Sequence, residues 1–202
     1  MTTILSSISA GNSLTPSGNI TPAAIMSRIN QITRRELTDI DSYLTTACRK
    51  IALRTGVLKA SESGTVSAST NTATAPSDLL ADSCVDVFYL NEEVMDNITF
   101  DEWREGKIKG YCVHSGTIYV SPTSNSDHTY TIFYSKQHPD VGDSIEFPDM
   151  YEEAIVQLVA ALIYGDYEDE ERESYRLNRY ERELMQLPSP VMVTQTRKGT
   201  RA

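Results

Sequence analysis

The sequence predicts an α+β fold that is mainly α, with a four-helix bundle core. A small antiparallel β region is inserted into this core, and extended arms lie at both ends. Two helical patterns come first and two come last, with short β-branched runs and turn signals between them. The simplest packing puts residues 21–58 and 147–187 in one helical bundle core and residues 59–146 in a β-rich insertion.

The bulk composition narrows the class of protein. The 202-residue chain has a formal net charge of −10, and 40% of its residues are hydrophobic, which is typical of a soluble globular protein. The acidic excess argues against a general nucleic-acid binder. No apolar run approaches the roughly 20 residues of a membrane helix, so we expect no membrane partner. Three distant cysteines favour a reduced, cytoplasmic setting.

The N-terminal part predicts an arm followed by two helices. Residues 1–20 are rich in Ser, Thr, Gly and Asn and have no helical period. The first helix begins at Thr21-Pro22, because Thr is a good N-cap and Pro is tolerated at the first helical position. The second begins near Thr38 and ends at Gly56, which tolerates the left-handed C-cap conformation.

The middle of the chain has short, strand-like runs. Residues 59–75 are rich in Ser, Thr and Ala, which predicts a long loop or a weak hairpin. Strands are predicted over 84–90 and 130–135. A hairpin is predicted over 110–120, turning at Ser115-Gly116.

The last two predicted helices precede a short arm. One begins at Phe147-Pro148-Asp149, and the other runs from about Glu168 to Leu187. The apolar stripe of the last helix is Leu177, Tyr180, Leu184 and Leu187. The chain then breaks at Pro188-Ser189-Pro190, and residues 188–202 form an arm that is first apolar and then basic.

No catalytic or metal-binding pattern stands out. Cys112 and His114 share one face of a predicted strand, but a metal site needs three or four converging ligands. The acidic residues of 166–173 suit a solvated turn and helix start, where negative charge favours the helix dipole. We therefore expect no enzyme, no catalytic residue, no metal and no cofactor.

Aromatic residues supply the candidates for contacts between proteins. Trp103, the only tryptophan, is interpreted as a partly buried anchor, with an inter-subunit contact as the alternative. Tyr167 and Tyr175 suit core packing and a subunit or tail interface equally well. Tyr180 is assigned to the core.

Four stretches resemble the head-to-tail connector (adaptor) proteins of tailed bacteriophages. The resemblance covers about residues 20–187 and is of moderate specificity. The stretches are LTDIDSYLTTACRKIA, APSDLL, the pair YCVHSGTIYVSP and YTIFYSKQHP, and EFPDMYEEAIVQLVAALIYGDYEDEERESYRLNRYERELMQL. Residues 59–74 depart from the family pattern, because they are Ser/Thr/Ala-rich where a clearer strand pair is expected.

The resemblance implies a structural virion protein of the neck, present in the host cytoplasm during assembly. It implies a homo-oligomeric ring, commonly of twelve copies, beneath the portal protein, with downstream neck or tail proteins attached. DNA would pass through the ring without specific binding, as an acidic wall favours.

The resemblance also implies that residues 188–202 form a docking arm for the portal. Its apolar part would add as a short strand or fill a groove, and its basic part would pair with acidic portal surface. The implied portal-binding residues are Val191, Met192, Val193, Thr194, Arg197, Lys198 and Arg201.

Other functions stay open at this point. One is a tail-side neck or tail-terminator protein, which would bind the tail tube. Another is a ligand-binding module that uses Trp103, Tyr111 and Tyr119 on one face of the β region. A hydrolase using the acidic helical hairpin ranks last, because its carboxylates lack a partner His or a metal set.

Overall fold

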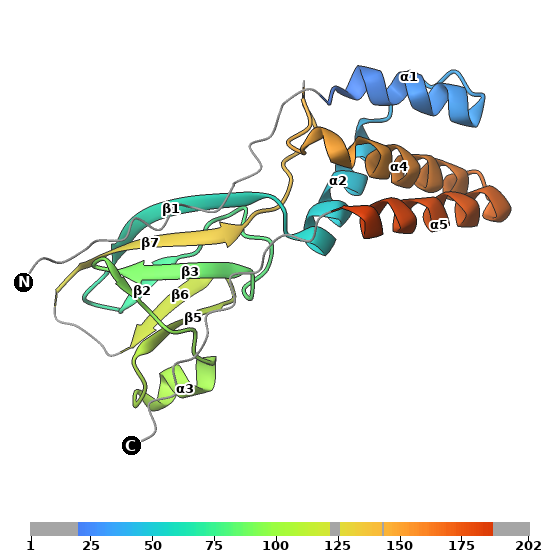
Figure 1. Ribbon diagram of the computed structural model, residues 1–202. Helices are drawn as coiled ribbons and strands as arrows, with labels where there is room; N and C mark the ends of the chain where they lie inside the picture. The colour runs from blue at the N-terminus through green and yellow to red at the C-terminus, as the bar shows by residue number, and fades with distance from the viewer. Residues whose placement is uncertain (1–19, 122–125, 143, 188–202) are drawn as a thin grey trace, which may run out of the picture. The chain divides into compact units, whose positions relative to one another are not determined.

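The computed structural model describes residues 20–121, 126–142 and 144–187, and these residues divide into two compact units (Figure 1). Residues 20–48 and 140–187 form a helical unit. Residues 49–139 form a β unit. No helix of the described residues is long and apolar enough to cross a membrane.

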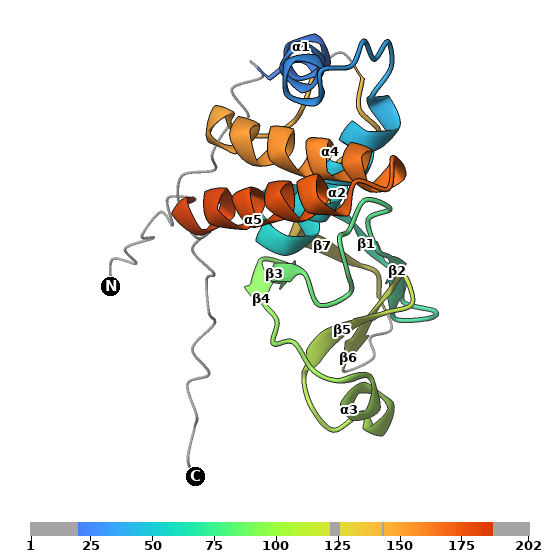
Figure 2. The ribbon, with the colours of Figure 1, turned by 90° about the vertical axis from the view of Figure 1, so that its right-hand side faces the viewer.

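The helical unit is organised around one helix. It contains α1 (Pro22–Thr33), the first half of α2 (Asp41–Thr55), a 3-10 turn (Asp149–Tyr151), α4 (Glu152–Asp166) and α5 (Glu170–Gln186). Figures 1 and 2 both show α4 between α1 and α5. The central place of α4 follows from its composition, because a helix that is apolar all round is stable only when it is covered on most sides. Its buried residues are Ala154, Ile155, Val156, Gln157, Leu158, Val159, Ala160, Ala161, Ile163 and Tyr164.

The predicted four-helix bundle core is wrong. The described residues form five α-helices and two antiparallel sheets, and only α1, α4, α5 and half of α2 build the helical unit. The expected stripe of α5 fails because Tyr180 is its only buried residue, while Leu177 is 38% exposed. A bundle needs an apolar stripe on every helix, and α5 is too polar to supply one.

Several local predictions in the helices are confirmed. Thr21 is the N-cap of α1, and its hydroxyl accepts a hydrogen bond from the Ala24 amide at 3.3 Å. Gly56 follows α2 with a φ of +57°, the left-handed conformation that favours glycine. Tyr180, assigned to the core from the sequence, is buried.

The β unit contains two antiparallel sheets. The first has the order β1 (Lys59–Val66), β7 (His128–Ser135), β3 (Val85–Leu90) and β4 (Glu93–Val94). The second has the order β2 (Thr72–Thr74), β6 (Thr117–Ser121) and β5 (Gly110–His114), and the short helix α3 (Phe100–Glu105) contacts β5 and β6.

An aromatic core fills the β unit. Phe88 of β3 stacks on Tyr111 of β5 and Tyr130 of β7, with ring centroids 4.6 and 5.6 Å apart. Such offset ring pairs add to the free energy gained by burying apolar area. The buried residues of this core are Val66, Ala75, Phe88, Met95, Tyr111, Ile118, Val120, Tyr130, Ile132 and Tyr134.

The predicted hairpin is confirmed, but the predicted loop is not. β5 and β6 join through Ser115 and Gly116, whose φ values of 50° and 73° match a two-residue hairpin turn. Residues 59–75, expected to form a loop or weak hairpin, instead supply β1 and β2. β1 pairs with β7 along its whole length, so tertiary pairing overrides the weak strand propensity of its Ser and Gly residues.

Candidate interaction surfaces

Two tyrosines flagged in the sequence lie exposed on the helical unit, each beside an arginine. Tyr167, just after α4, is 49% exposed, and Tyr175 on α5 is 56% exposed. The guanidinium carbon of Arg35 lies 3.5 Å from the ring centroid of Tyr167, and that of Arg176 lies 5.3 Å from the ring centroid of Tyr175. These geometries are cation–π contacts, and Tyr and Arg are enriched where proteins bind one another.

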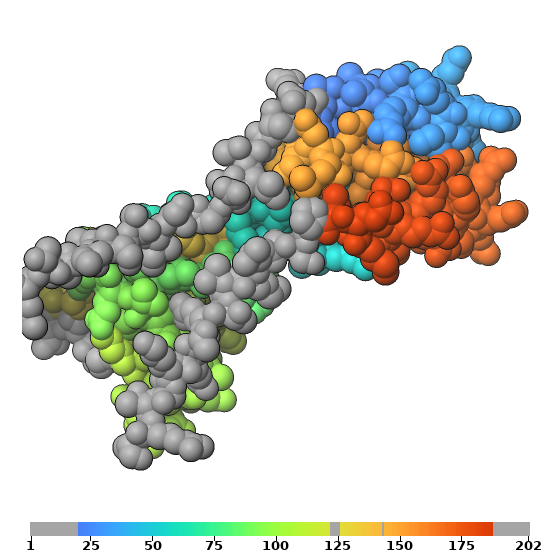
Figure 3. Space-filling model, in the orientation of Figure 1, coloured from blue at the N-terminus to red at the C-terminus, as the bar shows by residue number. Residues whose placement is uncertain are grey.

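A surface groove of about 390 Å³ lies between the end of α1 and the first half of α5. Tyr164 of α4 lines the groove, and its hydroxyl donates a hydrogen bond to the Ile32 carbonyl at 3.1 Å. Figure 3 shows α1, α4 and α5 on one face of the helical unit. The groove is lined by Ile32, Thr33, Arg34, Tyr164, Glu171, Arg172, Tyr175 and Arg176.

A polar network holds α1 and α5 against α4. Arg28 of α1 forms ion pairs with Glu152, at 2.8 Å, and with Glu153. Gln157 is 1% exposed; its amide nitrogen donates to Glu153 at 2.6 Å, and its amide oxygen accepts from Arg176 of α5 at 3.1 Å. The network satisfies a buried amide that would otherwise cost stability.

The charge on Glu153 is stabilised by this network. Its partial burial opposes ionisation, but hydrogen bonds from Arg28 and Gln157 and the charges of Arg28 and Arg179 outweigh the burial and lower the pKa of Glu153. Burial lowers the pKa of Arg28, but its hydrogen bonds to Glu153 and Glu152 and the charges of these carboxylates outweigh the burial and raise that pKa. These residues therefore fasten helices together rather than forming an acid–base pair.

Trp103 is the anchor of α3. A capping box starts the helix, in which the Thr99 hydroxyl and the Glu102 side chain each accept a hydrogen bond from the other's backbone amide. The indole Nε1 donates to the Val120 carbonyl at 3.2 Å, and the half-buried ring lies 4.5 Å from the Tyr119 ring. Because the Trp103 side chain is only half-buried, part of it stays accessible to a partner.

The three aromatics of the predicted ligand-binding face do not lie together. Trp103 and Tyr119 pack against each other and against Phe100. Tyr111 is 2% exposed and belongs to the aromatic core. The β unit therefore does not present this trio as an exposed platform.

The Cys112–His114 pair does not form a metal centre. Cys112 is buried, which raises the pKa of its thiol. His114 is exposed and stacks on Phe100, with ring centroids 4.4 Å apart. In the part of the chain that the structure describes, no three His, Cys, Asp or Glu residues gather as a metal site would require.

The predicted acidic turn has a structural part in the helical unit. Asp169 is the N-cap of α5 and accepts a hydrogen bond from the Arg172 amide at 3.2 Å. Asp166 accepts one from the Tyr43 hydroxyl at 2.6 Å, which joins α2 to the end of α4. Both carboxylates thus cap or link helices.

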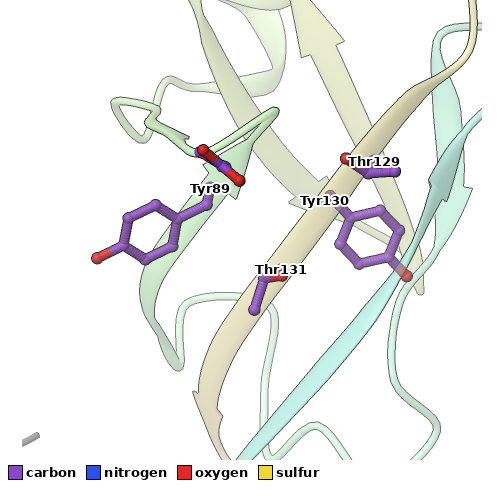
Figure 4. Close-up of a pocket in the computed structure, with 5 residues that line it drawn as sticks. Tyr89, Thr129, Tyr130 and Thr131 are labelled. Carbon is purple, nitrogen blue, oxygen red and sulfur yellow. The ribbon is translucent and has the colours of Figure 1, made fainter.

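Sequence reasoning missed a second hollow, of about 430 Å³, on the four-stranded sheet (Figure 4). Tyr89 and Thr131 lie opposite each other in the register of β3 and β7, and Tyr89 makes an edge contact with Phe133 at 6.1 Å. The period-two alternation of Thr129, Thr131 and Phe133 along β7 was the available signal. The remaining lining residues are Glu92, Thr129 and Tyr130.

The predicted portal-binding residues lie outside the described residues. They are Val191, Met192, Val193, Thr194, Arg197, Lys198 and Arg201. Their role stays a prediction.

No curated protein matches the chain. A family model described as "SU10 adaptor protein" matches residues 20–202.

Proposed function

Because the chain belongs to the SU10 adaptor protein family, a phage adaptor family, we propose that it forms a ring beneath the portal and extends the DNA channel. As an adaptor it is a structural protein of the virion that contacts other virion proteins. The family match over residues 20–202 is the observation that carries the proposal. In the ring we expect twelve copies and a platform for tail attachment.

The C-terminal arm is the proposed portal contact. Val191, Met192 and Val193 are apolar and suit strand addition or a groove between portal subunits. Arg197, Lys198 and Arg201 would pair with acidic portal surface and speed association.

The exposed aromatics are proposed as contacts between copies or with the tail. Tyr175 lies beside the Arg-lined groove of the helical unit, and Tyr167 carries Arg35 on its ring. Trp103 supplies a partly accessible indole on the β unit. Tyr, Trp and Arg carry much of the binding free energy in protein interfaces, which supports this assignment.

The acidic composition supports passage of DNA. In the helical unit acidic side chains outnumber basic ones more than twofold. A wall of this sign repels the phosphate backbone, whereas a basic wall would bind it through counterion release.

A pull-down against purified portal and against purified tail-side proteins tests the proposal. We expect the wild-type protein to bind portal and to appear as a ring in electron micrographs of the complex. The variant R197Q/K198Q/R201Q should bind portal at least about tenfold more weakly, with a stronger loss at high salt. The control K50Q/K107Q/R182Q removes the same charge from exposed positions and should bind normally.

Two outcomes would count against the proposal. Equal portal binding by the wild-type protein and the arm variant would contradict the docking role of residues 188–202. Binding to tail-side proteins without binding to portal would identify a tail-side neck or terminator protein instead.

A further inference from the structure

The eight-residue strand β1 has an outer edge with which no other strand of the described residues pairs. β1 is the first strand in the order β1-β7-β3-β4, so within the described part of the chain β7 is its one partner strand (Figure 1). It pairs with β7 from Lys59 to Val66 without a register shift. Pro, bulges and charged side chains are the devices that usually protect an edge strand from pairing with another chain. β1 contains no Pro and no bulge, and its charged residues are Lys59, which pairs with Asp86, and Glu62.

The hydrogen bonds of β7 show which backbone groups face outward. Leu58 precedes β1, and its carbonyl accepts from the Lys136 amide, so Leu58 and Lys136 form a hydrogen-bonded pair. Such pairs alternate in an antiparallel ladder. The N–H and C=O groups of Lys59, Ser61, Ser63 and Thr65 therefore point away from β7.

The other side of β7 gives the same assignment independently. The Ser135 amide donates to Cys84 and the Thr129 carbonyl accepts from Asn91, so the odd-numbered residues of β7 bond toward β3. These residues of β7 lie opposite Lys59, Ser61, Ser63 and Thr65 of β1. Among the described residues, no backbone hydrogen bond reaches these outward groups of β1.

The side chains along this edge leave room for another strand. Ser61, Ser63 and Thr65 are exposed, small and uncharged. On the opposite side of the strand, Ala60 and Gly64 are half-buried, and the Tyr130 ring packs over Gly64 so closely that a Cβ there would come within 2.8 Å of it. An added strand could therefore lay alternate apolar side chains beside an aromatic residue of the core.

We propose that residues 2–9 of a neighbouring copy add to this edge as a fifth strand. Residues 1–19 contain no charged side chain, so they bring no like charge against the two charged residues of β1, which are Lys59, paired with Asp86, and the exposed Glu62. In residues 2–9, Ile4 and Ile8 fall on one face at a spacing of two strand periods. The ten residues from 10 to 19 span up to about 33 Å when extended, which allows the segment to reach a second molecule.

The assignment to a neighbouring copy rests on the proposed ring. Each copy has one N-terminal segment and one β1 edge, so passing the segment from copy to copy around a ring uses every segment and every β1 edge. Pairing of β1 with β1 would instead be isologous and would stop at a dimer. Residues 188–202 are less suited to this edge, because they carry three basic side chains and are proposed to bind portal.

Hydrogen–deuterium exchange of the full-length protein, with residue resolution in β1, tests the inference. In the ring, the amides of Ser61, Ser63 and Thr65 should exchange at least about tenfold more slowly than in a variant lacking residues 2–9. The amides of Glu62 and Gly64, which bond to β7, should be protected in both proteins and serve as an internal control. Fast exchange of the outward amides in the wild-type ring would overturn the inference, as would equal protection in the deletion variant.

A proline on the edge provides a second, matched test. Ser63→Pro removes one outward N–H and leaves the backbone bonds to β7 in place, because that amide does not take part in them. The hydrogen bond between the Ser63 and Thr131 hydroxyls is lost in both Ser63→Pro and Ser63→Ala, so it does not distinguish the two variants. Ser63→Pro should remove the protection of the Ser61 and Thr65 amides, whereas Ser63→Ala should retain it. Unchanged protection of Ser61 and Thr65 in Ser63→Pro would contradict strand addition.

A disulfide test separates this inference from the ring itself. Ser63→Cys combined with Ser6→Cys or Ser7→Cys should give covalently linked copies under oxidation, while Ser63→Cys alone should not. If copies are linked but no rings form, the strand exchange stands and the ring is rejected. If rings form but the outward amides of β1 exchange fast, the ring stands and the strand exchange is rejected. If the disulfides form only within single chains, the neighbouring copy is not the donor.

Discussion

The neighbouring helices α4 and α5 have similar lengths and opposite compositions. α4 has 15 residues, of which ten are buried, whereas α5 has 17 residues and buries only Tyr180. Helix α4 therefore builds the core of the helical unit. Helix α5 packs on it along one edge, and most side chains of α5 stay accessible. The difference separates the part of the helical unit that supplies stability from the part available to partners.

The largest expected effect comes from truncating α4. Ile155 is fully buried, so Ile155→Ala should lower the free energy of unfolding by about 3 kcal/mol. On α5, Met185 is 79% exposed, and Met185→Ala should change the free energy of unfolding by less than about 0.5 kcal/mol. Urea unfolding measures both, and equal losses would show that the two helices do not differ as described.

A smaller effect is expected where α5 fastens to α4. Arg176→Met removes the donor to the buried Gln157 oxygen and should cost about 1–2 kcal/mol of stability. Arg182→Met, on an exposed position of the same helix, is the matched control and should be nearly neutral. A neutral Arg176→Met would mean that the network does not hold α5 in place.

The ion pairs between α1 and α4 should contribute to the free energy of unfolding in a pH-dependent way. The pKa of Glu153 is lower in the folded protein than in the unfolded chain. The stabilisation that ionised Glu153 gives is therefore fully present above its pKa in the unfolded chain, and it is lost as the pH falls through its pKa in the folded protein. Because Arg28 is partly exposed, Arg28→Met should cost only about 0.5–1 kcal/mol at pH 7. Urea unfolding at pH 7 and pH 3 should show the difference from wild type shrinking at pH 3; a constant difference would rule out the ion pairs as its source.

The smallest effect on stability is expected at the outer face of α5. Tyr175 is 56% exposed, so Tyr175→Ala should change the free energy of unfolding by less than about 0.5 kcal/mol. If this tyrosine lies in an interface, the same change should weaken assembly with portal about tenfold or more. Ser174→Ala is the control, and sedimentation of mixtures with portal is the measurement.

Local signals in the sequence predicted local structure well. The Thr21 cap and the Ser115-Gly116 turn depend on a few adjacent residues, and both have the expected conformation. The packing of the helices depends on distant parts of the chain, and there the prediction failed. The spacing of Leu177 and Tyr180 suggested a full stripe, but period alone does not show that the partner α4 would be covered from several sides.

The strand β1 shows the same limit. Its Ser, Gly and Ala residues have little strand propensity of their own, and order comes from pairing with β7, about seventy residues away. Among the site residues, the sequence identified the exposed Tyr167 and Tyr175 by type. The Arg35 and Arg176 contacts with their rings required the structure.

An electron cryo-microscopy reconstruction of the portal-bound assembly would test the central claim most directly. The account predicts a ring in which Tyr175 and the outer face of α5 are buried against a neighbouring copy or a tail protein. In the same ring, α4 should be buried by helices of its own copy. A ring in which the outer face of α5 is open to solvent in every copy would contradict it.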